Sequence, residues 1–189
     1  MKRKSVVSAG AVLLVAALYF FGGAEEIAAL FSAVLVHEAG HAAVICLCGG
    51  RIRSLSFNAA GLSMVYSGVV SEKAELLSVI MGPLFGILAA LLTLKTAPLF
   101  AYISLFLSAY NLLPALPLDG GRALYCLLLR RKSIGNAEKI LTVSGIASGL
   151  LLLFSGLYAL HHELGLALIF AGIYLLIAQT GIVKSLSVM

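Results

Sequence analysis

The chain has 189 residues, of which 61% are hydrophobic and 11% charged, and its mean hydropathy is +1.09. A soluble domain carries about 25% charged residues, so this composition excludes an ordinary water-soluble protein and indicates a membrane protein. The net charge is +5. Because the basic residues gather on one side of the predicted spans, the positive-inside rule explains this charge, and no nucleic-acid partner is expected.

About six apolar runs, each near the 20 residues that cross a hydrocarbon core, follow one another along the chain. They cover residues 5–23, 27–48, 76–94, 98–118, 140–160 and 164–183. A cytoplasmic N-terminus leaves Lys95 as the one basic residue outside. The sequence thus predicts an all-α, multi-pass integral membrane protein of a bacterial-type cell membrane. The first run also resembles a signal peptide, but its length favours an anchor.

Residues 49–74, between the second and third runs, are not plainly a spanning helix. Apolar and polar residues alternate over 54–58 and again over 62–67, and Asn58-Ala59-Ala60-Gly61 between them is typical of a turn. The pattern predicts a small β-hairpin, and an ordinary cytoplasmic loop fits the residues about equally well. No repeat or linker is evident, so residues 1–189 are expected to form a single domain.

The fourth run ends in a stretch that no regular helix can occupy. Residues 111–122 place two prolines and two glycines in an apolar context. Irregular backbone at membrane depth is tolerated only where protein buries it or where it lines a wet cavity. The stretch is therefore a candidate site.

The second run contains His37-Glu38-Ala39-Gly40-His41, which matches the pattern His-Glu-x-x-His. Histidines four residues apart share one helix face, so both imidazoles can bind one Zn²⁺. Glu38 can then lie beside the open position of the metal and act as general base toward its bound water. A structural or transport histidine pair is the simpler alternative, but three ionisable residues within five positions of a spanning helix are usually functional.

A catalytic zinc ion with two histidine ligands needs a third protein ligand. Of the eight acidic residues, three are predicted to be external and three lie in or beside cytoplasmic loops. With Glu38 as the base, Asp119 remains, and its predicted depth agrees with that of His41. The predicted metal ligands are therefore His37, His41 and Asp119, with one zinc ion per chain.

The two motifs together resemble the site-2 protease family of intramembrane zinc metalloproteases. They are His37-Glu38-x-x-His41 and Asn111-x-x-Pro114-x-x-x-Leu118-Asp119-Gly120-Gly121. The six-run layout resembles the branch of that family that includes the stage IV sporulation protein FB peptidases. The resemblance implies zinc-dependent cleavage of membrane-embedded protein substrates, with Asp119 as third ligand and the hairpin holding the substrate extended.

The chain departs from some of these relatives, because neither a CBS nor a PDZ domain is found in it. Regulation would then depend on other membrane proteins. Asn111, Pro114 and Gly120 are expected to bind substrate or to brace the broken segment, and both roles remain open. The rival function is a metal-ion transporter that uses the His and Asp residues, a function that leaves Glu38 without a role. An inactive scaffold of the same fold is disfavoured because all four chemical residues are present.

Overall fold

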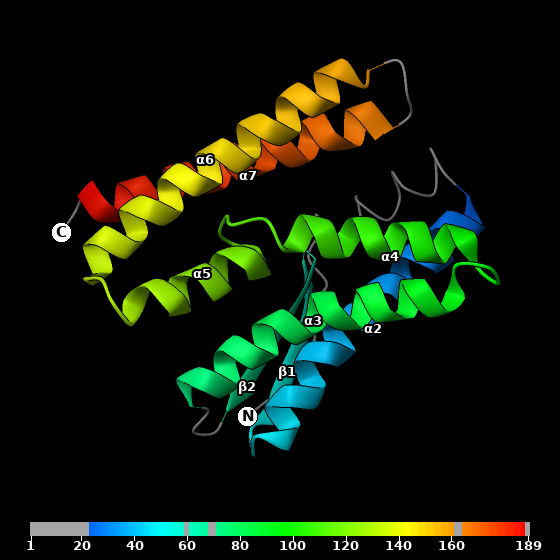
Figure 1. The fold of residues 1–189 in the computed structure, drawn as a ribbon, viewed down its shortest axis with the longest axis horizontal. Helices are drawn as coiled ribbons and strands as arrows, with labels where there is room; N and C mark the ends of the chain where they lie inside the picture. Colours follow the sequence, from blue (N-terminus) through cyan, green and yellow to red (C-terminus); the bar gives the residue numbers. More distant parts are fainter. Residues whose placement is uncertain (1–22, 59–60, 68–70, 161–163, 188–189) are drawn as a thin grey trace. The chain divides into compact units, whose positions relative to one another are not determined.

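The computed structural model describes residues 23–58, 61–67, 71–160 and 164–187 (Figure 1). The elements in chain order are α2 (Ala24–Leu47), β1 (Arg51–Asn58), β2 (Gly61–Ser67), α3 (Glu72–Thr93), α4 (Pro98–Asn111), α5 (Asp119–Leu129), α6 (Ile134–Tyr158) and α7 (Leu164–Ser187). Internal contacts divide the chain into two compact units, Met1–Ala109 and Tyr110–Met189. Each unit is described by itself below.

Three helices of the described residues are long and apolar enough to cross a membrane, namely α2, α3 and α6. The apolar part of α7, Gly165–Thr180, is shorter. The predicted helical class is therefore confirmed in its coarse form, a mostly helical chain with candidate membrane-spanning helices. The first predicted run, residues 5–23, lies outside the described residues except for Gly23, so the count of six spans stays a prediction.

Helix α2 ends where two glycines follow it. Gly49 has φ +86, in the left-handed region that glycine adopts without a steric penalty. The Gly49 amide donates to the carbonyl of Cys46 (3.1 Å) and the Gly50 amide to that of Ile45 (2.8 Å), which is the hydrogen-bond pattern of a Schellman motif. These bonds satisfy carbonyls in the last turn, so the chain leaves α2 sharply and enters β1.

Strands β1 and β2 pair antiparallel, with Leu55 opposite Met64 and Phe57 opposite Leu62. The register shifts between Ile52 and Ser54, which indicates a bulge at Arg53. The strands occupy the region in which the sequence predicts a hairpin. Residues 59–60, at the predicted turn, lie outside the described residues.

In the first unit, α2 and α3 lie side by side (Figure 1). Ser71 is the N-cap residue of α3, and its side chain accepts a hydrogen bond from the Ala74 amide (3.3 Å). Helix α4 begins with Pro98, which suits a first helical position because no amide hydrogen is required there. Ser104 of α4 donates to the carbonyl of Gly86 in α3 (3.0 Å), so these two helices share a polar contact.

In the second unit, α6 and α7 form a close antiparallel pair (Figure 1). They approach at Gly149 and Gly172, where a methyl group on Gly172 would lie 2.8 Å from the Gly149 carbonyl oxygen. Small residues of this kind let membrane helices pack backbone to backbone. Leu175 of α7 is fully buried and forms a small apolar core with Ala115 and Leu118.

The boundaries differ from the predicted runs mainly around α5 and α6. The fourth run is helical only to Asn111, and a separate helix, α5, begins at Asp119. Helix α6 begins at Ile134, whereas the fifth predicted run begins at residue 140. Residues 161–163, between the fifth and sixth predicted runs, lie outside the described residues.

Candidate metal centre

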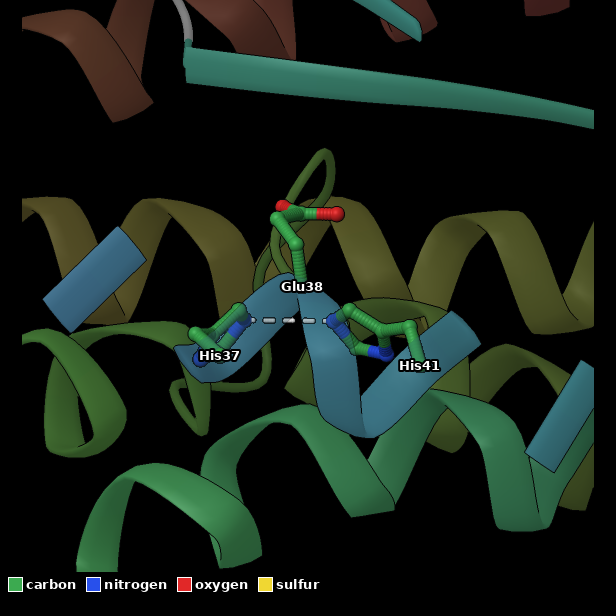
Figure 2. A group of neighbouring side chains, drawn as sticks. All are labelled: His37, Glu38 and His41. Atoms are coloured by element: carbon green, nitrogen blue, oxygen red, sulfur yellow. Dashed lines mark hydrogen bonds between the residues drawn. The ribbon is translucent and has the colours of Figure 1, made fainter. Parts of the chain in front are cut away.

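His37, Glu38 and His41 lie on neighbouring turns of α2 (Figure 2). The buried positions of this helix form one stripe that contains both histidines, whose exposed fractions are 4% for His37 and 8% for His41. Their possible ligand atoms and that of Glu38 all lie within 4.8 Å of one another. The structure therefore gathers three of the four predicted site residues around one point.

The two histidines are spaced for a shared metal ion. Their Nε2 atoms face one another at 3.2 Å, as the dashed line in Figure 2 shows. Two nitrogen ligands at the usual zinc distance and a tetrahedral angle lie about 3.3 Å apart. The observed separation agrees with that value, so the pair fits zinc without a change in the position of the helix.

Contacts with α3 fix the ring of His41. Nδ1 of His41 lies 2.8 Å from the carbonyl oxygen of Ser78. Because a carbonyl oxygen only accepts, Nδ1 carries the hydrogen and Nε2 of the neutral ring keeps its lone pair for a metal. The Ser78 hydroxyl donates in return to the backbone carbonyl of His41 (3.3 Å). A metal-binding histidine is commonly oriented by such a second contact.

Two glycines let α2 and α3 approach at the metal centre. A methyl group on Gly40 would overlap the carbonyl oxygen of Met81. A methyl group on Gly82 would overlap Nε2 of His41 itself. The backbone of α3 therefore forms one wall of the site, and the lack of a side chain at Gly82 leaves room for the ring of His41.

Asp119 is the first residue of α5 and is 8% exposed. Its Oδ1 lies 3.8 Å from a guanidinium nitrogen of Arg122, one turn along the same helix. A carboxylate at a helix N-terminus is stabilised by the exposed amides and the helix dipole. Asp119 belongs to the second unit, so its role as a metal ligand stays a prediction.

The segment before Asp119 folds tightly onto the first turn of α5. A methyl group on Gly120 would overlap the carbonyl of Leu112, and one on Gly121 would overlap the backbone of Ala115. Pro114 is exposed, and its carbonyl accepts a hydrogen bond from the Ser144 hydroxyl of α6 (2.6 Å). Gly120 and Pro114 thus have bracing contacts. Asn111 is the half-buried last residue of α4, and its role stays a prediction.

Two side chains of the second unit contact the segment before α5 and were not predicted as site residues. Ser144 of α6 and Gln179 of α7 both donate hydrogen bonds to carbonyls of the segment before α5. An amide side chain inside an apolar run is the one signal that marks Gln179 in the sequence. Its partner is 63 residues away, so the contact itself could not be predicted.

Comparison with known proteins gives consistent matches. A family model described as Peptidase family M50 matches residues 62–153, a range that includes Asp119 and begins after His41. Zinc metalloprotease MJ0392 of Methanocaldococcus jannaschii is 28% identical over 146 residues, 70% of this chain and 42% of that protein. Stage IV sporulation protein FB of Bacillus subtilis is 28% identical over 143 residues, 69% of this chain and 50% of that protein.

A solved structure titled Site-2 Protease from Methanocaldococcus jannaschii superposes with a TM-score of 0.67 at 23% identity, covering 90% of this chain and 85% of that one. The fold is thus that of a site-2 protease. The predicted resemblance is confirmed, because a model of peptidase family M50, both curated relatives and this solved structure match the chain. It spans about half the length of the curated relatives that it matches. None of these matches supports a metal-ion transporter.

Proposed function

We propose that this protein is an intramembrane zinc metalloendopeptidase, which hydrolyses a peptide bond within or near the transmembrane segment of a membrane protein. The observation that carries the proposal is the arrangement of His37, Glu38 and His41 on α2, with the two Nε2 atoms 3.2 Å apart and the carboxylate beside them. A histidine pair with an adjacent carboxylate supplies both a metal site and a base, which are the two parts that metal-assisted hydrolysis of an amide uses.

His37, His41 and Asp119 would hold one zinc ion per chain, leaving the fourth position open. When bound, zinc would supply Lewis acidity that lowers the pKa of a water molecule and polarises the scissile carbonyl. Glu38 takes the proton of the attacking water and delivers it to the leaving amine. Ser78 keeps the imidazole of His41 in the tautomer that leaves Nε2 available.

Burial of the site supports a membrane-embedded substrate. Both histidines lie on the buried stripe of a helix that is long and apolar enough to span a membrane, so a substrate must reach them from the lipid phase or by unfolding beside them. We place residues 1–189 in one membrane domain with six spans and a cytoplasmic N-terminus. Membrane proteins that control access of the substrate are the expected regulators.

The two strands offer a means to hold the substrate extended. A helical segment must unwind before one of its peptide bonds can be cut, and an exposed strand edge can pair with it. β1 and β2 form a two-stranded sheet whose outer edges are not paired with another strand among the described residues. We propose that β1 and β2 are the two strands of the predicted hairpin and that one edge receives the unwound substrate.

The proposal is tested by reconstituting the purified protein with tagged single-pass membrane segments in lipid vesicles and mapping any cut by mass spectrometry. Wild type is expected to cut inside or at the border of a segment. Asp119→Asn is expected to lose both bound zinc and cleavage, because the amide is a weaker ligand than the carboxylate.

The transporter alternative makes the opposite prediction. If wild type cuts none of the segments but carries zinc into sealed vesicles, and Asp119→Asn abolishes that flux, the peptidase proposal is wrong. If wild type cuts and Asp119→Asn retains full zinc content, the peptidase proposal stands but Asp119 is not the third ligand.

A further inference from the structure

Gln179 is a buried amide inside the apolar helix α7. Its exposed fraction is 1%, in a segment whose neighbours in sequence are mostly apolar. A polar side chain at membrane depth is costly unless its hydrogen-bonding groups find partners. The side-chain Nε2 of Gln179 donates two hydrogen bonds, one to the carbonyl of Leu116 (2.8 Å) and one to the carbonyl of Leu175 in its own helix (3.2 Å).

The two partners fix the orientation of the amide. Both are carbonyl oxygens, which only accept hydrogen bonds, so the nitrogen of the amide must face them. The oxygen, Oε1, then faces α6, where a methyl group on Gly145 would lie 2.5 Å from both Oε1 and Cδ. Gly145 therefore provides the space that the amide occupies.

The contact with Leu116 satisfies a carbonyl that the broken backbone leaves open. In the segment that leads to α5, the carbonyls of Tyr110, Leu113, Ala115 and Leu118 accept backbone amides. Those of Pro114 and Leu116 instead accept side chains, the hydroxyl of Ser144 from α6 and the amide of Gln179 from α7. The paired helices α6 and α7 thus hold the segment at two points.

Apolar packing acts at the same place. Leu175 lies one turn before Gln179 and packs with Ala115 and Leu118. Leu118 is the N-cap residue of α5, and Asp119 follows it directly. A displacement of the segment at Leu116 therefore moves the backbone that carries the Asp119 carboxylate, three residues further on.

We propose that Gln179 is a positioning residue for the metal centre: through its hydrogen bond to the Leu116 carbonyl, it sets the position from which Asp119 binds zinc. This inference rests on the proposed function, in which Asp119 is the third ligand. The loss of a hydrogen bond made directly to a metal ligand typically lowers metal affinity by about 10- to 100-fold. Because Gln179 contacts the backbone before Asp119 and not its carboxylate, we expect an effect at the lower end of this range.

The test compares wild type with variants of the full chain in detergent. Two quantities are measured for each protein: zinc affinity by chelator competition, and the visible spectrum of the cobalt-loaded form. Gln179→Met keeps the volume and removes the donor, and Thr180→Val, on the exposed side of the same helix, is the matched control. Gln179→Met is expected to lower zinc affinity by about 10-fold. Its cobalt spectrum at saturation should shift toward that of Asp119→Ala, whereas Thr180→Val should behave as wild type.

A folded Gln179→Met protein with the zinc affinity and cobalt spectrum of wild type overturns the inference. If Gln179→Met is not recovered folded, Gly145→Ala is measured by the same two readouts. Its methyl group would displace the Gln179 amide, which lies against Gly145. Wild-type zinc affinity and cobalt spectrum in Gly145→Ala would also overturn the inference. If Asp119→Ala itself keeps wild-type affinity and spectrum, the ligand assignment fails, and the inference with it. Weak zinc binding by Asp119→Ala beside normal binding by Gln179→Met rejects the inference alone.

Discussion

His41 and Ser78 exchange two hydrogen bonds between α2 and α3. Nδ1 of His41 donates to the Ser78 carbonyl (2.8 Å), and the Ser78 hydroxyl donates to the His41 carbonyl (3.3 Å). The first bond orients the imidazole, and it uses a backbone atom that no side-chain substitution removes. The second bond links the two helices and does not touch the ring.

Ser78→Ala separates these two contributions. The variant keeps the carbonyl that orients His41 and loses only the hydroxyl bond. We expect zinc affinity within about twofold of wild type and a free energy of unfolding lower by about 1 kcal/mol. Zinc titration and thermal unfolding of the same preparation check both values. A large loss of zinc affinity without a loss of stability would contradict this assignment.

Gly82→Ala is expected to damage the metal centre directly. The added methyl group overlaps Nε2 of His41, so the imidazole must move away from the position that it shares with His37. A displacement of about 1 Å at a catalytic site lowers the rate by about 100-fold. Cleavage rate and zinc content measure the effect.

Gly135→Ala in α6 is the matched control for that variant, because nothing lies within 4 Å of its added methyl group. The control is expected to cut at the rate of wild type. Equal rates for Gly82→Ala and Gly135→Ala would show that His41 does not need the close approach of α3.

Gly120→Ala tests the contact between α5 and the segment before it. Its methyl group would overlap the Leu112 carbonyl, and such overpacking typically costs about 1 to 3 kcal/mol. We expect a lower unfolding temperature than that of wild type or of Gly135→Ala, measured by thermal unfolding in detergent. An unchanged unfolding temperature would indicate that the Leu112 backbone can move away from the added methyl group without loss of stability.

Removal of the metal is expected to abolish cleavage and to lower stability. Because zinc binds the folded chain, zinc at about 100 times its dissociation constant adds about 2.7 kcal/mol to the free energy of unfolding. Thermal unfolding before and after chelation measures the difference, and added zinc should restore both activity and stability. His37→Ala is the control and should gain no stability from zinc; a gain equal to that of wild type would place the metal elsewhere.

Much of the first unit could be predicted because its signals are local. The spacing of His37 and His41 on a helix follows from the sequence alone, and the structure brings their Nε2 atoms together as the pattern predicts. One local signal also lies in the second unit, where the end of the regular helix at Asn111 follows from the prolines and glycines after it.

The second unit was harder to predict because its organising contacts are distant in sequence. Helix α5 has 11 residues, shorter than a membrane span, and no apolar run of the usual length marks it. The start of α6 was placed late because Asn136, Glu138 and Lys139 look like loop residues, although Ser133 is a suitable N-cap. The bond from Gln179 to Leu116 depends on tertiary packing, which no local pattern encodes.

The measurement that tests the central claim most directly compares Glu38→Gln with wild type for bound zinc and for cleavage of one membrane-embedded segment. Glutamine keeps the size of the side chain and removes the base. We predict that Glu38→Gln binds zinc as wild type does and cuts the segment at least about 100-fold more slowly. A Glu38→Gln protein that retains its zinc and cuts at the wild-type rate would contradict the assignment of Glu38 as the general base, and with it the proposed mechanism.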